Sequence, residues 1–149
     1  MKVIYNDTLP FGRFTAMTVM FWIFVRNGKR FTTRMLNHER IHARQQLEIA
    51  AACLLLGFVV ASLTGAWWWL LACVPAPFLV YALSVAIEVL LPPYDQVYRN
   101  SCFESEAIYN EHRRDYTRRW WRHLFAWVRY ISNAKYPYIP HEDRPPMQD

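Results

Sequence analysis

The charged and apolar positions of the chain fall into three blocks, with one long uncharged stretch between two charged flanks. From Ile49 to Ile87, 39 consecutive positions hold no Asp, Glu, Lys or Arg, and the 17 Lys and Arg residues divide into eight before this stretch and nine after it. A soluble core does not separate charge in this way. Because a membrane-spanning helix needs about 20 apolar residues, the stretch has the length of two spans and a tight turn.

We therefore expect a helical hairpin whose spans lie near residues 47–63 and 67–89. Small and polar residues at positions 62–66 mark the turn, and the three tryptophans directly after it are typical of the boundary between hydrocarbon and headgroups. Pro75 and Pro77 should kink the second span, which membrane helices tolerate. A buried hairpin inside a soluble protein is the alternative interpretation of the same pattern.

The N-terminal flank predicts a strand followed by a helix. Residues 14–26 are rich in β-branched and aromatic side chains, and Asn27-Gly28 directly after them is a hairpin-turn signal. We therefore expect a strand or a β-hairpin here. Thr32 or Thr33 can cap the following helix, which should run from Arg34 directly into the first span.

The C-terminal flank predicts more helix and then an irregular tail. Pro92-Pro93 should end the second span, residues 101–134 resemble one or two helices, and the proline-rich tail from Tyr136 should be extended or disordered. The predicted fold class is mainly α and integral to the membrane: a two-span transmembrane hairpin with a cytoplasmic α+β part, forming one domain over residues 1–149. Its successive parts are the strand or hairpin segment (1–33), the helix continuing into the hairpin (34–91), the later helices (92–135) and the tail (136–149).

Composition and charge fix the expected orientation and compartment. The chain is 54% hydrophobic and 19% charged, with a net charge of +5. Two spans put both termini on one side, and the positively charged flanks place that side in the cytoplasm, where they would meet anionic lipid of the inner membrane. We expect no nucleic-acid partner, because the arginine-rich region lies beside a membrane segment. Free cysteines suit this reducing compartment, and the N-terminus, MKVIYNDTLP, lacks the apolar core of a cleavable signal.

The polar sequence just before the uncharged stretch carries a metal-binding pattern. His38 and His42 are four residues apart, so on a helix both imidazoles project from one face. Two such imidazoles can bind Zn²⁺, and Glu39 between them can act as the general base toward a water that the metal activates. This H-E-x-x-H arrangement is the zincin pattern. Two histidines on an ordinary surface helix are the alternative.

A zincin needs a third protein ligand, and the helix predicted after the hairpin offers several acids. Glu104, Glu111 and Asp115 fall within about 40° of one another on a helical wheel, which gives an acidic face that could meet the two histidines. We rank Glu104 first as the ligand. Glu106 points elsewhere on the wheel, where a solvated role is usual, and Glu88 near the end of the second span is a further candidate.

Other side chains could support the metal ligands or the reaction. Gln45 and Gln46 follow His42 on or beside the ligand face and could orient ligands or substrate. The sequence also leaves four candidates for stabilising an oxyanion, namely Tyr109, His112, Tyr116 and His123.

His38-Glu39-x-x-His42, with the later segment Phe103-Glu104-x-Glu106-Ala107, resembles the gluzincin metalloproteases. In particular, it is similar to the membrane-embedded CAAX prenyl protease and heat-shock protease group. The run His42-Ala43-Arg44-Gln45-Gln46 also resembles the H-E-x-x-H-x-x-Q-Q form of small bacterial zincin-like domains. This resemblance implies that His38, His42 and Glu104 are ligands and Glu39 is the base. Ile108 replaces the aspartate that the family pattern has there, so Asn110, Glu111 or Asp115 would have to orient the ligands instead.

The sequence thus predicts a membrane-embedded zinc metalloprotease with one Zn²⁺ per chain, acting at the cytoplasmic membrane face on membrane proteins or membrane-tethered peptides. The N-terminal strand would bind an extended substrate by edge pairing. A zinc hydrolase of a lipid or of a small amide or ester is a second hypothesis with the same chemistry. A membrane-anchored metal-binding or adaptor protein without turnover is a third, although it would not need Glu39.

Overall fold

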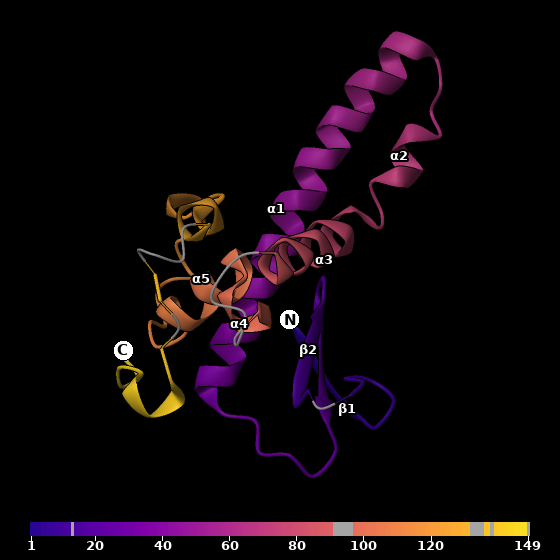
Figure 1. Ribbon diagram of the computed structural model, residues 1–149. Coiled ribbons are helices and arrows are strands. Elements are labelled where there is room, and N and C mark those ends of the chain that lie inside the picture. The colour runs from indigo at the N-terminus through magenta and orange to yellow at the C-terminus, as the bar shows by residue number, and fades with distance from the viewer. Residues whose placement is uncertain (13, 91–96, 132–135, 138, 149) are drawn as a thin grey trace.

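The computed structural model describes residues 1–12, 14–90, 97–131, 136–137 and 139–148 (Figure 1). The chain is mainly helical, as predicted, and has one small sheet that contains a strand, β1, beyond the predicted strand or hairpin. Its strands are β1 (Lys2–Asn6), β2 (Ala16–Val19) and β3 (Trp22–Arg26). Its α-helices are α1 (Thr33–Thr64), α2 (Trp69–Ala72), α3 (Ala76–Val89), α4 (Val97–Asn100) and α5 (Cys102–Asn110). Three short 3₁₀ helices follow: η2 (Trp120–Arg122), η3 (Ala126–Tyr130) and η4 (His141–Asp143).

The sheet has the strand order β1-β3-β2, with β1 parallel and β2 antiparallel to β3. The strand region predicted at 14–26 is a hairpin, and its turn lies at Met20 and Phe21 because Val19 pairs with Trp22. Met20 adopts a positive φ of 50° there. The turn predicted at Asn27-Gly28 does form, but it follows β3 and leads toward α1 instead of joining two strands.

Helix α1 begins where the sequence predicts and ends within one residue of the predicted end of the first span. The hydroxyl of the N-cap Thr32 accepts a hydrogen bond from the backbone N–H of Met35, which satisfies one of the amides left free in the first turn. The helix continues for 32 residues to Thr64 and ends at Gly65, whose φ of 71° is the left-handed conformation favoured for glycine. Ser62 to Thr64 are thus the last residues of the helix and not part of the turn.

The second arm of the hairpin is not the single kinked helix that the sequence predicts. It consists of the short α2 and the 14-residue α3, with a break at Cys73–Pro75. Proline has no N–H to donate and its ring clashes with the preceding turn, so Pro75 and Pro77 stand at the start of α3. Of the described helices, only α1 is long and apolar enough to cross a membrane. The predicted end of this arm at Pro92-Pro93 lies outside the described residues.

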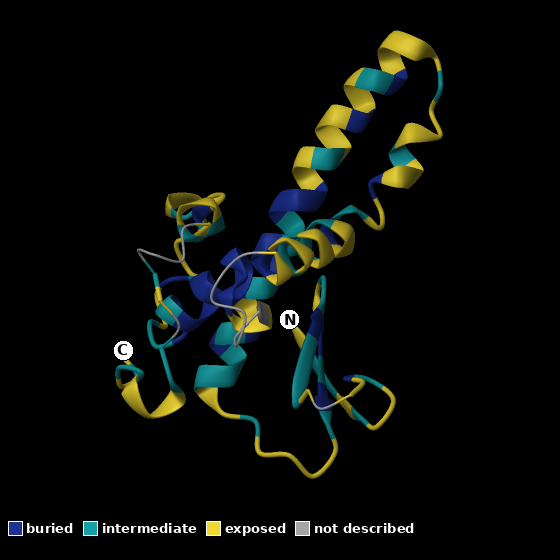
Figure 2. Cartoon of the chain, viewed as in Figure 1, coloured by how far each residue is buried: buried dark blue, intermediate teal, exposed yellow. Residues whose placement is uncertain are grey.

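The hairpin projects from the rest of the molecule and is largely uncovered (Figures 1 and 2). Leu55, Leu63 and Leu71 are 69%, 81% and 72% exposed. The arms approach closely at Gly57, where an added Cβ would lie 2.9 Å from the Cys73 sulfur. Only 22% of the most apolar 18-residue part of α1 is buried. Uncovered apolar surfaces of this kind are typical of membrane or partner contacts.

The core lies between the polar half of α1 and α5. Ile41, Ala107 and Tyr116 form one buried cluster, and Ile49 packs with Phe103 in another. The helices predicted over 101–134 are wrong beyond Asn110, where α5 ends and turns and 3₁₀ segments follow; residues 132–135 lie outside the described part.

The described part of the tail is also more ordered than the sequence predicts. It contains η4, and the backbone N–H of Gln148 donates to the carbonyl of His112. These contacts hold the tail beside α5 although its prolines favour an extended chain.

Candidate metal centre

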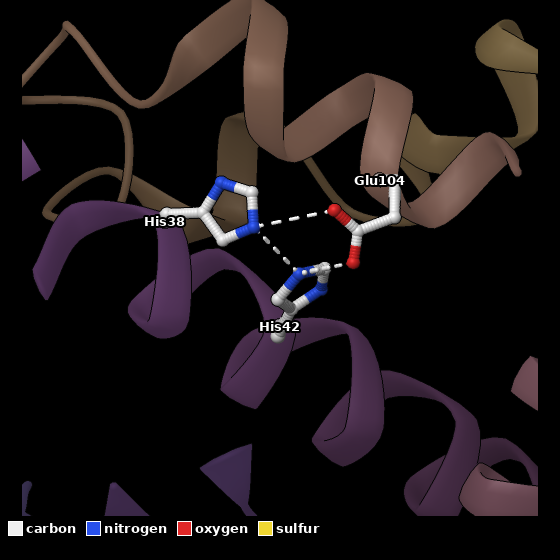
Figure 3. Close-up of side chains that lie close together, drawn as sticks. All are labelled: His38, His42 and Glu104. Atoms are coloured by element: carbon white, nitrogen blue, oxygen red, sulfur yellow. Dashed lines mark hydrogen bonds and ion pairs between the residues drawn. The ribbon is translucent and has the colours of Figure 1, made fainter. Parts of the chain in front are cut away.

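His38, His42 and Glu104 converge on one point between α1 and α5 (Figure 3). The four-residue spacing puts both imidazoles on the same face of α1. Ser101 caps α5 by accepting from the backbone N–H of Glu104, which places this carboxylate in the first turn, facing α1. The Nε2 atoms of the histidines lie 3.0 Å apart, and the Glu104 oxygens lie 3.1 Å from His42 Nε2 and 3.4 Å from His38 Nε2.

The outer nitrogens of both imidazoles have partners that fix their protons. His38 Nδ1 lies 2.9 Å from Glu111 Oε2, and an ionised carboxylate can only accept. His42 Nδ1 lies 2.8 Å from Gln45 Oε1. The amide of Gln45 cannot be reversed, because its Nε2 donates to the Phe103 carbonyl and to Glu106 Oε2. Both Nδ1 atoms are therefore donors, and in the neutral rings both Nε2 atoms present lone pairs to the centre.

Two lone pairs and a carboxylate facing one another repel unless a cation lies between them. In the metal-free protein this cation is a proton. Burial by itself lowers the pKa of His38, but hydrogen bonds with Glu104 and Glu111 outweigh it and raise that pKa to about 10. Burial likewise opposes the charge of Glu104, but the two histidines hold the pKa of this carboxyl well below its usual value. The centre is thus built to hold positive charge.

The spacing of the donor atoms fits a tetrahedral metal ion. Ligands at about 2.1 Å from a tetrahedral Zn²⁺ lie about 3.4 Å from one another, and the separations here are 3.0, 3.1 and 3.4 Å. Two imidazoles and one carboxylate are also the donor set of catalytic zinc sites, which keep a fourth position open. In donor type and in the spacing of the donor atoms, the three residues brought together by the fold therefore suit Zn²⁺.

Glu39 lies beside this centre and is held by the sheet. It lines the same cleft as both histidines, a space of about 730 Å³ bounded by β2, α1, α3 and the tail. The hydroxyl of Thr18 on β2 donates to Glu39 Oε2 at 2.6 Å. Glu39 is 8% exposed, so its carboxylate has a fixed orientation and a small opening to the cleft.

Glu111 and Asp115, which the helical wheel treats alike, have different environments. Glu111 caps the end of α5, contacts His38 and also binds Arg144 of the tail at 3.0 Å and Arg34 at 3.4 Å. Burial raises the pKa of Glu111, but His38 and Arg144 more than offset this and lower it. Asp115 lies past the end of the helix with half of its side chain exposed, 3.7 Å from Arg113. The predicted acidic face therefore includes Glu104 and Glu111 and not Asp115.

The other acids are placed away from the metal ligands. Glu106 is fully buried and not solvated as expected: it pairs with Arg44 and accepts from Gln45 and from the Tyr116 hydroxyl. Glu88 is buried at the end of α3 and is not one of the three residues that converge. Gln46 ties α1 to the sheet, accepting from the Met20 backbone N–H and donating to the Thr18 carbonyl.

The candidates for oxyanion stabilisation do not line the cleft, as far as the described residues show. Tyr109 donates to the Pro137 carbonyl, and His123 stacks on Tyr116. Asn110, a candidate for orienting the ligands, instead donates to the carbonyl of Glu106 and to the Tyr130 hydroxyl.

Several residues at the centre carried no recognisable signal in the sequence. Tyr81 of α3 and Tyr98 of α4 both donate to Glu104 Oε1 at 2.8 Å. Burial raises the pKa of Tyr98, so it remains a donor. Two more such residues are Thr18, which donates to Glu39, and Arg144, which pairs with Glu111. Tyr81, Thr18 and Arg144 lie more than 20 positions from the residues that they contact, and only their polar character within apolar or proline-rich surroundings could have drawn attention to them. Tyr98 lies six positions before Glu104, and no motif marks it.

The chain matches no protein-family model, no curated protein and no solved structure. What it does is therefore inferred from the chemistry of this centre and from the apolar hairpin beside it.

Proposed function

We propose that this chain is a zinc-dependent metalloprotease of the gluzincin type, embedded in the membrane and acting at its cytoplasmic face. The observation that carries the proposal is the set of three hydrogen-bond acceptors, His38 Nε2, His42 Nε2 and the Glu104 carboxylate, which need a cation between them. Glu39 in the same cleft supplies the base that a purely structural metal site does not need.

The side chains divide the chemistry among them. Bound by His38, His42 and Glu104, Zn²⁺ would lower the pKa of a water and polarise the scissile carbonyl. Glu39 takes the proton of the attacking water and later gives it to the leaving amine, while Thr18 keeps its carboxylate turned toward the cleft. Glu111 and Gln45 hold the imidazoles by their Nδ1 atoms.

The edge of the sheet favours a peptide as the substrate. The Arg26 N–H donates to the Thr15 carbonyl, so in the alternating antiparallel pattern the backbone groups of Ala16 and Thr18 point away from β3. Both residues line the cleft. Gln46 already pairs with the Thr18 carbonyl at the far end of this edge. An extended peptide could add to the remaining edge by backbone hydrogen bonds and so pass the metal ligands.

Helix α1 connects the centre directly to the proposed membrane segment. His42 lies seven residues before Ile49, about 10 Å along the helix, which holds the metal ligands near the headgroups. We place the second span in the arm that contains α2 and α3, whose apolar side chains are as exposed as those of α1. With two spans, the arginine-bearing flanks and both termini lie in the cytoplasm. Substrates would be membrane proteins or membrane-tethered peptides.

A lipid ester or amide is the second candidate substrate, because one wall of the cleft is apolar. Pro77, Phe78 and Tyr81 of α3 form this wall, which continues into the exposed face of the arm. The residues that would activate water are the same for both substrates.

The test uses the full chain reconstituted in lipid vesicles with Zn²⁺, supplied with quenched-fluorescent peptides tethered to the membrane. Glu39→Gln should keep its metal and lose hydrolysis by about 100-fold or more, the usual contribution of a general base. Glu142→Gln, an equal change on the exposed η4, should hydrolyse as fast as wild type. Release of fatty acid or lysolipid that depends on Glu39, with intact peptide, would instead favour the lipid substrate. Equal rates in wild type and Glu39→Gln would contradict both.

A further inference from the structure

Residues 118–129, RRWWRHLFAWVR, form a second surface whose chemistry the metal centre does not use; we call them the Arg/Trp segment. It holds four arginines and no acid. The segment contains η2 and η3 and lies beside α1 (Figure 1). Its Trp127 packs against the buried Phe103, whereas Trp120, Trp121 and Phe125 are exposed. Trp120 and Trp121 are 51% and 58% exposed, a large apolar surface in a segment whose charged side chains are all arginines.

The contacts of this segment place it at one level along α1. The backbone N–H of Phe125 donates to Glu48 Oε2 at 3.0 Å. Glu48 is the last charged residue before the uncharged stretch begins at Ile49. The Arg/Trp segment therefore lies at the height where α1 changes from charged to apolar.

A groove of about 1000 Å³ separates the segment from α1. Its lining is mostly apolar and includes Ala51, Ala52 and Leu55 of the uncharged stretch. Arg40 and Arg118 supply positive charge, and the one acid of the lining, Glu48, pairs with Arg44 at 3.1 Å. The groove thus combines a cationic part with an apolar part that continues along α1 into the proposed span.

We infer that the Arg/Trp segment and this groove bind an anionic phospholipid, with the phosphate near Arg118 and the acyl chains along α1. Exposed tryptophans prefer the headgroup boundary, and arginines at that level attract anionic headgroups. The inference rests on the membrane placement proposed above but not on hydrolysis. The lipid would fix the depth of α1 and so the height of the metal centre above the bilayer.

Arginines interleaved with exposed aromatic rings also suit a single-stranded nucleic acid. The groove favours lipid, because its far end opens onto Ala51, Ala52 and Leu55, which offer a nucleic acid neither charge nor hydrogen bonds. Oligonucleotide binding is therefore an alternative outcome of the test.

The test measures lipid retained by the detergent-purified full chain, titrated with phosphatidylglycerol or phosphatidylcholine and observed by native mass spectrometry. Wild type should retain phosphatidylglycerol at least tenfold more tightly than phosphatidylcholine. Arg118→Gln/Arg122→Gln should weaken phosphatidylglycerol by about 25-fold, or about fivefold for each arginine near a membrane surface. The matched control, Lys29→Gln/Arg30→Gln, removes the same charge from an exposed loop and should leave the affinity unchanged.

Three results would overturn the inference. They are equal affinity for phosphatidylglycerol and phosphatidylcholine, an equal loss of phosphatidylglycerol affinity in Lys29→Gln/Arg30→Gln, and binding of an oligonucleotide to wild type that Arg118→Gln/Arg122→Gln abolishes. Zinc content and peptide hydrolysis, measured in zwitterionic detergent, should be normal in Arg118→Gln/Arg122→Gln. Glu39→Gln should keep the preference for phosphatidylglycerol, so a failure of the lipid site and a failure of the proposed protease are separately visible.

Discussion

Replacing Glu111 by Gln tests whether the contacts behind the metal ligands matter. The change removes the charge that His38 Nδ1 faces at 2.9 Å. Loss of such a partner to a metal-bound histidine costs 10- to 100-fold in metal affinity. Glu111 also stabilises the proton on His38 that competes with zinc, so removing its charge weakens this competition and offsets part of the lost affinity. The offset is small, because Glu104 contributes more than Glu111 to the raised pKa of His38. We therefore expect zinc to bind about tenfold more weakly, about 1.4 kcal/mol.

The assay is competition between the purified protein and a fluorescent zinc chelator at pH 7.5. Asp115→Asn is the matched control, because it makes the same chemical change at an exposed position that the sequence places on the same helical face. It should bind zinc as wild type does. A zinc dissociation constant for Glu111→Gln within twofold of wild type, or an equal loss of affinity in Asp115→Asn, would show that the Glu111 contact does not support zinc binding.

Three further predictions concern protonation, the base and the hairpin. Hydrogen bonds raise the pKa of His38 to about 10 against the effect of burial, so below that pH zinc must displace a proton from His38 in order to bind. The affinity for zinc should therefore rise about tenfold per pH unit between pH 7 and 9. Calorimetry in buffers of different ionisation enthalpy measures the released proton, and a zinc affinity independent of pH would contradict this prediction. The same proton stabilises the metal-free fold, whose free energy of unfolding should fall as pH rises from 6.5, the ordinary pKa of histidine, toward 10, as chemical denaturation at several pH values would show. Thr18→Val should leave zinc content unchanged and slow hydrolysis about tenfold or more, since it removes a hydrogen bond to the charged Glu39; an unchanged rate would remove Thr18 from the site. Leu63→Cys, in a chain without its native cysteines, should react in intact cells with a membrane-impermeant maleimide while Arg30→Cys does not, and the reverse labelling would overturn the proposed orientation.

The sequence predicts those parts of the centre that depend on local geometry. His38 and His42 share a face because of helical periodicity alone, and Thr32 caps α1 because a hydroxyl at that position satisfies a free amide. The acidic side chains that α5 directs toward the histidines were predicted from a helical wheel, which treats the helix as continuous. The wheel places Glu104 correctly, and also Glu111 at the C-cap, but it misplaces Asp115 because α5 ends before this residue.

What the sequence does not predict depends on contacts between distant segments. The turn at Met20 and Phe21 lacks the glycine or asparagine that normally marks a hairpin turn. The apolar residues of β2 and β3 therefore form one uninterrupted stretch in the sequence, which does not show where the first strand ends. Arg144 binds Glu111 across 33 positions of chain, and no local pattern in a proline-rich tail indicates an ion pair of that kind. Glu106 is buried and not solvated because Arg44 lies opposite it on α1, a pairing set by the packing of two helices.

The proposed function depends on His38, His42 and Glu104 forming one zinc site across the hairpin. The most direct test is the metal content of the detergent-purified protein, measured for wild type beside His42→Ala and Glu104→Ala. We expect about one zinc per wild-type chain and a strongly reduced content in both variants, with retained secondary structure. No bound metal in wild type after exposure to zinc, or full occupancy in Glu104→Ala, would contradict it.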